Sequence, residues 1–177
     1  GGWLYFIANN EAGTSSNNLY RTKGVSSGVE LVAEDIQWIE QTIEDQVYFG
    51  YWRQINGTWF RHLGRAGGES LVVERFESAS SDYTYEPSSK TRIAQIGEQA
   101  YFYGKNETNG AELWTSDGTP AGTHGLDLYP GLASSNAENL FFVHGRLFFT
   151  ADDGMHGKEL WVVDTLTQHL YLPVIRK

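Results

Sequence analysis

The chain has 177 residues and no cysteine, and its 13 lysine and arginine residues against 22 aspartate and glutamate residues give a formal net charge of −9. The absence of cysteine excludes disulfide frameworks, thiol nucleophiles and cysteine-ligated metals. The acidic balance disfavours a nucleic-acid partner, because phosphate neutralisation drives such binding. No apolar run reaches the roughly 20 residues of a membrane-spanning helix, and the length suits a single domain over residues 1–177.

The composition favours strands over helices, because 20 glycines, 6 tryptophans, 10 tyrosines and 9 phenylalanines are spread through segments rich in turn residues. Four aromatic runs recur, with starts 43, 53 and 47 residues apart: WLYF at 3–6, QVYF at 46–49, QAYF at 99–102 and RLFF at 146–149. Each precedes a second segment that ends in an aromatic residue: NLY at 18–20, TWF at 58–60, ELW at 112–114 and ELW at 159–161. A period of about 40 to 50 residues indicates a repeat architecture.

In chain order, the first repeat predicts strands at 3–6 and 18–20. The second predicts strands at 37–43, 46–52, 58–63 and 70–76, the third at 92–97, 99–104, 111–116 and 123–129, and the fourth at 140–145, 146–153, 158–164 and 168–173. Turn signals such as Asp117-Gly118 and Asp153-Gly154 separate these strands.

Several strands, such as LYFI and LFFV, are apolar on both faces, so their sheets must be covered on both sides. Stacked four-stranded meanders predict an all-β fold and, within that class, a β-propeller of four blades with four antiparallel strands each. A β-solenoid is the structural alternative, although its repeats are usually shorter. The expected blades are about 1–35 plus 173–177, about 36–78, about 91–130 and about 138–172.

The first repeat begins at 3–6 with the segment that corresponds to the second strand of the other blades, so its first strand does not precede it in the sequence. PVIRK at 173–177 followed by GGWLYF parallels FFVHG followed by RLFF. We therefore expect the C-terminal segment to pair in blade one and close the ring, which would remove unpaired sheet edges. The competing interpretations are a piece of a longer array and two copies joined into a larger ring.

Three segments carry a resemblance to a known family: GAELWTSDGTPAGT at 110–123, DLYPGLASSNAENL at 127–140 and LFFTADDGMHGKELW at 147–161. They resemble the ELWxxDGT repeat family across about residues 97–164, whereas NLYRTKG and TWFRHLG in the first two repeats keep the strand and lose the motif letters. The resemblance implies a propeller-like repeat domain of bacterial proteins that are exported or displayed on the cell surface. It implies no established catalytic activity.

For the residues of the motif, structural roles are the favoured interpretation. Trp114 and Trp161 are expected to pack between blades, since buried aromatic side chains contribute a large apolar area. Asp117, Gly118 and Thr119 are typical of turn chemistry, with Asp117 accepting local backbone hydrogen bonds and Gly118 at positive φ. Metal binding is the second interpretation of this turn.

The loop ADDGMHGKE at 151–159 is the best metal candidate, because Asp152, Asp153 and Glu159 bring three carboxylates into one connection, together with His156. Calcium favours such oxygen ligands, but the spacing departs from the EF-hand pattern. A hydrated acidic turn is therefore the favoured interpretation. We expect no required cofactor, with calcium as the ion that this loop would suit.

The sequence predicts a non-enzymatic protein. The five histidines are scattered, and neither an HExxH pair nor a Gly-x-Ser-x-Gly elbow is present. A glycine-rich phosphate loop between a strand and a helix is also missing.

The favoured function is a secreted or cell-surface binding or adhesion module that presents propeller loops to carbohydrate or protein. Exposed aromatic residues in loops would favour sugar binding, and the candidates are Trp38, Trp52, Tyr83 and Tyr85. The alternative is a structural subunit or spacer of an extracellular assembly, which includes a homo-oligomer. A propeller hydrolase or lyase is the third hypothesis.

Overall fold

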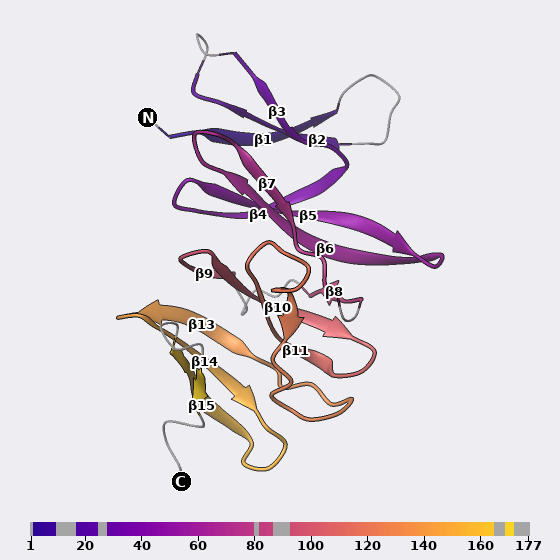
Figure 1. The fold of residues 1–177 in the computed structure, drawn as a ribbon, viewed down its shortest axis with the longest axis vertical. Coiled ribbons are helices and arrows are strands. Elements are labelled where there is room, and N and C mark those ends of the chain that lie inside the picture. The colour runs from indigo at the N-terminus through magenta and orange to yellow at the C-terminus, as the bar shows by residue number, and fades with distance from the viewer. Residues whose placement is uncertain are drawn as a thin grey trace. The chain divides into compact units, whose positions relative to one another are not determined.

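A computed structural model describes residues 2–9, 17–24, 28–79, 82–86 and 93–164, and the backbone of the strand at 169–171. Within these residues all regular structure is β, and no helix is present. The strands form four antiparallel sheets (Figure 1), which confirms the prediction of an all-β fold. Contacts within the chain divide it into two compact units, unit 1 (Gly1–Phe76) and unit 2 (Glu77–Lys177).

The first sheet of unit 1 has the order β1-β2-β3, with β1 at Leu4–Asn9, β2 at Asn17–Thr22 and β3 at Glu30–Ala33. The aromatic rings of Phe6 and Tyr20 stack across β1 and β2, 5.7 Å apart. The segment 173–177, which the sequence predicts as a further strand of this sheet, lies outside the described residues. Ring closure therefore stays a prediction.

The second sheet of unit 1 is a meander in chain order: β4 (Ile36–Ile43), β5 (Gln46–Ile55), β6 (Thr58–Gly67) and β7 (Val72–Arg75). In the registers of this sheet, β4 pairs with β5 only as far as Tyr51, and β7 pairs with β6 only over Gly64–Gly67. The end of the β5–β6 hairpin therefore extends beyond both neighbouring strands, as Figure 1 shows. We call residues 52–61 the arm.

The core of unit 1 lies between its two sheets. It contains Leu19, Val32, Ala33, Ile36, Val47, Phe49, Tyr51 and Ala66. Strand β5 supplies alternate residues to this core, while the intervening Tyr48 is also fully buried and meets Phe76 edge to face. This arrangement explains why the strand is apolar on both faces, since each face is covered.

The third sheet, in unit 2, has the order β12-β11-β10-β8, and β9 also pairs with β10. Its strands are β8 (Thr84–Tyr85), β9 (Ala94–Ile96), β10 (Gln99–Asn106), β11 (Gly110–Ser116) and β12 (His124–Gly125). One edge of β10 thus takes two short strands, β9 opposite Gln99–Tyr101 and β8 opposite Gly104–Lys105. Strand β8 was not among the predicted strands.

The fourth sheet is a meander of β13 (Glu138–Val143), β14 (Arg146–Asp152), β15 (Lys158–Asp164) and β16 (His169–Tyr171). A core cluster joins it to the third sheet and contains Tyr101, Leu113, Leu128, Ala137, Leu147, Phe149, Ala151, Trp161 and Val163. Trp161 thus packs between sheets, and its indole N–H donates to the carbonyl oxygen of Ala151 at 3.1 Å. Burying such a ring and satisfying its N–H are both stabilising.

Candidate functional site

Glu112 of the ELWTSDGT segment fastens a loop onto strand β11. Its carboxylate is fully buried and accepts backbone N–H donors from Leu128 and from Ser135, each at 3.0 Å. Burial raises the pKa of the Glu112 carboxyl, and the hydrogen bonds from Ser135 and Leu128 oppose that rise. Both oxygens are therefore used in holding the loop 126–135 against the hairpin β10–β11.

The turn after β11 confirms the structural interpretation of the Asp-Gly-Thr letters. Asp117 Oδ1 accepts the backbone N–H of Thr119 at 2.8 Å and its hydroxyl at 2.7 Å. Gly118 has φ +89°, a conformation in which glycine carries no steric penalty. The hydroxyls of Ser116 and Thr123 lie 2.7 Å apart and close the same loop.

The acidic loop at 151–159 is organised by its own backbone. Asp153 Oδ1 accepts the backbone N–H groups of Met155 and His156, both at 2.9 Å, and Oδ2 lies 2.7 Å from His156 Nδ1. These hydrogen bonds, with the His156 side chain first, lower the pKa of Asp153 to about 2. Asp152 Oδ1 accepts the backbone N–H of Gly154 at 2.7 Å.

The three carboxylates of the metal prediction do not gather around one point. Glu159 lies on β15 opposite Ala151, and its Oε2 is buried with no hydrogen-bond partner among the described residues. No group of three or more histidine, aspartate or glutamate side chains suited to a metal ion is found in the described part of the chain. Calcium binding by Asp152, Asp153 and Glu159 stays a prediction.

The four predicted ligand-binding aromatics lie in different settings. Tyr83 is fully buried and stacks on Trp114 with ring centroids 4.5 Å apart, and Tyr85 is buried edge to face against Phe102. Trp38 lies on β4 beside Gly50, where its ring occupies the space of a Cβ, and its indole N–H donates to Glu40 at 3.0 Å. These three side chains have structural partners within their own units.

Trp52 differs, because it lies on the arm and is 43% exposed. In the register of β5 and β6, Trp52 is opposite Arg61 and Gln54 is opposite Trp59. Since side chains on a strand alternate between faces, these four residues share one face of the arm. Trp59 is 59% exposed, so both indoles of this face reach solvent.

The turn of the arm fixes this register. Asn56 and Gly57 have φ values of 49° and 85°, which are typical of the two-residue turn that favours Asn-Gly. The other face of the arm carries Arg53, Ile55, Thr58 and Phe60. Trp59 was not among the predicted site residues, although Asn-Gly between two strands does predict that Trp59 pairs with Gln54 and therefore joins the face of Trp52.

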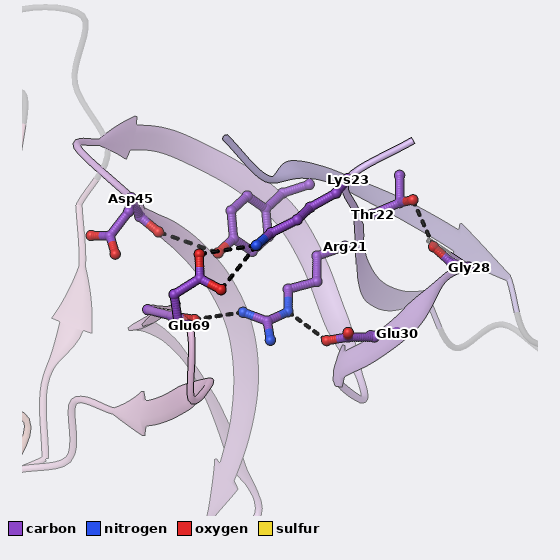
Figure 2. Close-up of polar contacts among 9 residues, drawn as sticks. Arg21, Thr22, Lys23, Gly28, Glu30, Asp45 and Glu69 are labelled. Carbon is purple, nitrogen blue, oxygen red and sulfur yellow. Dashed lines mark hydrogen bonds and ion pairs between the residues drawn. The ribbon is translucent and has the colours of Figure 1, made fainter. Parts of the chain in front are cut away.

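A second feature of unit 1 is a network of ion pairs at the end of strand β2, shown in Figure 2. Arg21 pairs with Glu30 at 2.8 Å and donates to the carbonyl oxygen of Gly68 at 2.7 Å. Lys23 pairs with Glu69 at 2.9 Å. The network therefore ties the first sheet to the turn between β6 and β7.

A cleft of about 250 Å³ lies beside this network and is lined by Gly2, Trp3, Tyr5, Thr42, Glu44, Asp45, Gln46 and Glu69. The Arg21 guanidinium lies 3.8 Å from the ring centre of Trp3, and the Lys23 ammonium lies 4.6 Å from it. Cation–π contacts of this kind attach the ring to the protein's own charges. Trp3 therefore serves the ion-pair network and does not offer a bare aromatic face.

Unit 2 has a cleft of about 230 Å³ lined by Gln99, Tyr101, Thr115, Asp117, Gly122, His124, Leu126 and Val163. Its lining residues include an aspartate and a histidine, which are residue types that serve in acid–base catalysis. The polar groups are engaged locally, since Thr115 donates to Gln99 at 2.8 Å and Asp117 holds Thr119. Among its lining residues the cleft has no second carboxylate, and the Thr115 hydroxyl is committed to Gln99.

Comparisons with known proteins found no relative: no family model, no curated protein and no solved structure matches the chain. In the described residues, no helix has the length and apolar character required to cross a membrane. Function is therefore argued from the geometry of the described residues.

Proposed function

We propose that this chain is a non-enzymatic carbohydrate-binding module, and that the face of the arm with Trp52 and Trp59 binds the glycan. The observation that carries the proposal is the exposure of two indoles on one face of one hairpin. The backbone below them is held in register, because β5 and β6 pair over ten residue pairs. Binding residues on such a scaffold need little ordering when a ligand arrives.

The chemistry of the face suits a sugar. A pyranose ring has a face of C–H groups and a rim of hydroxyl groups, so it requires an apolar plane beside hydrogen-bonding side chains. The two tryptophans provide the plane, and large apolar groups left in solvent mark interaction sites. Gln54 adds an amide to this face, and its oxygen can accept a hydrogen bond from a sugar hydroxyl.

The wider setting is also part of the proposal. We propose that the four sheets are blades of a β-propeller closed by residues 173–177, that the chain is related to the ELWxxDGT repeat proteins, and that it acts at the cell surface. Support comes from the four antiparallel sheets and from the motif residues that hold unit 2 together. An acidic, cysteine-free chain with exposed aromatic residues is compatible with this setting.

The test is a glycan array probed with the wild-type chain and with the double variant Trp52→Ala/Trp59→Ala. We expect the variant to lose at least about tenfold in affinity, since truncation of central interface tryptophans commonly costs more than 1 kcal/mol. Phe142→Ala is the matched control, because it removes an exposed aromatic side chain from β13 in unit 2. Equal binding by the double variant and the wild type would overturn the proposal.

The same array in calcium and in chelator separates the arm from the acidic loop. Binding by the arm should be independent of calcium, whereas calcium-dependent binding would assign the ligand to Asp152–Glu159. A chain that binds no glycan and forms a stable oligomer would favour the structural spacer. Conversion of a polysaccharide would favour a hydrolase or lyase.

A further inference from the structure

Two Asn-Gly dipeptides lie at hairpin turns of this chain. Asn56-Gly57 is the turn of the arm, and Asn109-Gly110 joins the turn after β10 to strand β11. Asparagine is a chemically labile residue, and glycine is its most permissive neighbour, because no side chain hinders the approach of the glycine backbone nitrogen to the asparagine side chain. The same reactive pair therefore occurs in two different surroundings.

The Asn56-Gly57 dipeptide is open to solvent. Both residues are exposed, and among the described residues no hydrogen bond holds the Asn56 side chain. A Cβ placed on Gly57 would meet no atom within 4 Å. The last strand pair of the arm joins Ile55 to Thr58, so the two turn residues lie outside the ladder. The surroundings therefore leave this dipeptide free to change its conformation.

The Asn109-Gly110 dipeptide is enclosed. Asn109 Oδ1 accepts the hydroxyl of Thr108 at 2.6 Å, and the Asn109 backbone N–H donates to Asn106 Oδ1 at 2.7 Å. Gly110 is buried, and a Cβ placed on it would lie 2.7 Å from the Leu132 carbonyl oxygen. A distant segment of the chain therefore lies against this backbone, and the asparagine is held on both its side chain and its main chain.

We infer that Asn56 is a site of spontaneous deamidation and that the fold protects Asn109 from the same reaction. The Gly57 backbone nitrogen loses its proton and attacks Cγ of Asn56. The new C–N bond closes a succinimide ring, and the bond from Cγ to Nδ2 breaks with release of ammonia, which carries away the proton. Water then opens the ring: cleavage at Cγ leaves aspartate, and cleavage at the Asn56 carbonyl carbon leaves isoaspartate. Water is the only co-reactant.

The geometry of ring closure explains the selectivity. The glycine nitrogen and the asparagine Cγ must come within bonding distance, so the peptide plane between the two residues has to rotate. At Asn56 this rotation breaks no side-chain hydrogen bond within the described chain and displaces solvent. At Asn109 it would break the contacts with Thr108 and Asn106 and would require the hairpin end to open locally. The opening equilibrium therefore slows the reaction at Asn109.

Deamidation would change both the charge and the backbone of the arm. Either product places a carboxylate in residues 52–61, which contain two arginines and no aspartate or glutamate. Isoaspartate also adds one backbone atom to a turn whose two-residue length matches the register of β5 and β6. The reaction therefore alters the hairpin that carries Trp52 and Trp59.

The test is to incubate the full chain in a mildly alkaline buffer and to follow the peptides that contain the two dipeptides by mass spectrometry. We expect the mass gain of deamidation at Asn56 and a rate at Asn109 that is at least about tenfold lower, because reaction there requires local opening. In urea, where both turns are unfolded, the two rates should become similar. Asn56→Gln, whose longer side chain cyclises far more slowly, should remove the product from the arm peptide and leave the Asn109 peptide unchanged.

The outcomes decide the inference in either direction. Equal rates at the two sites in the folded chain, or faster reaction at Asn109, would overturn it. A ratio of the two rates that is the same in buffer and in urea would show that the neighbouring sequence, and not the fold, sets the selectivity. An arm peptide of Asn56→Gln that gains the same mass at the same rate would place the reaction at another residue. Faster reaction at Asn56 in the folded chain, with the difference lost in urea, would support the inference.

Discussion

The hairpins β5–β6 and β10–β11 follow the same sequence plan and end differently. All seven residues of β11 are buried, whereas β6 begins with two exposed residues, Thr58 and Trp59. In the ELW segment Trp114 is buried against Tyr83, while in the TWF segment Trp59 faces solvent. The middle residues of the two segments correspond to each other, and Leu113 is fully buried whereas Trp59 is 59% exposed.

The loop 126–135 covers the start of β11. Ser135 donates its backbone N–H to Ala111, the Ala111 N–H donates to the Ser134 hydroxyl at 3.0 Å, and Glu112 binds the same loop. The TWF segment has threonine where ELW has glutamate, and the arm has no such cover among the described residues. Glu112 therefore anchors the loop that covers this end of the hairpin, and the arm has threonine at the corresponding position.

Replacing Glu112 should have the largest effect on this contrast. We expect Glu112→Ala to lower the free energy of unfolding by about 2 to 4 kcal/mol, because hydrogen bonds to a charged acceptor are lost and the N–H of Leu128 is left without its acceptor. Urea denaturation measures the loss, and amide hydrogen exchange at Leu128 should accelerate first.

Glu107→Ala is the control for Glu112→Ala, because Glu107 is an exposed glutamate in the turn of the same hairpin. Its effect should remain within about 0.5 kcal/mol, as for most surface substitutions. Similar losses from both variants would contradict the role of Glu112 as the anchor of the loop.

Glycine substitutions at the two hairpin turns should have the next largest effects. Gly110 and Gly57 both have positive φ, but a Cβ on Gly110 would lie 2.7 Å from the Leu132 carbonyl oxygen, whereas a Cβ on Gly57 meets nothing within 4 Å. Gly57→Ala should therefore cost only the backbone strain, about 1 kcal/mol, and Gly110→Ala at least about 2 kcal/mol. Thermal unfolding of both variants checks the order, and equal shifts would show that the loop does not cover Gly110 closely.

Much of this fold could be predicted from the sequence. The aromatic runs predict β5, β10 and β14 near their observed starts, because turn residues and hydrophobic pattern are local signals. Strand β8 could not be predicted, since its two residues pair with Gly104 and Lys105 far along the chain. The sequence places Tyr85 in a loop for the same reason.

The candidate site, like the fold, could be predicted from the sequence only in part. Trp52 could be singled out as an aromatic residue, but whether a tryptophan is exposed depends on the loop that covers it. The sequence contains no local signal that Trp114 is covered by Tyr83, which is 31 residues earlier in the chain, or that Trp59 is left exposed. Side-chain exposure is a tertiary property, and a repeat motif predicts position along the chain only.

The smallest effect that we expect from the contrast between the two hairpins is a pH dependence of the unfolding free energy, which comes from Glu112 in β10–β11. Burial raises the pKa of Glu112 above its ordinary value of 4.5, so between these two values the folded state binds more protons than the unfolded state. The stability that this group contributes is therefore full below about pH 4.5 and is lost as the pH rises through the folded pKa. Glu112→Gln does not titrate, so the unfolding free energy of the wild type relative to Glu112→Gln should fall as the pH rises from 4.5.

Denaturant unfolding of both proteins across that range measures the slope. Asp153 does not interfere, because its pKa is lowered to about 2 and its contribution changes only below the ordinary value of 3.8. A difference between the two proteins that stays constant would mean that Glu112 titrates alike in the folded and unfolded chains. In that case the hydrogen bonds that the Glu112 carboxylate accepts would fully offset the free-energy cost of burying its charge, and the carboxylate would still hold the loop.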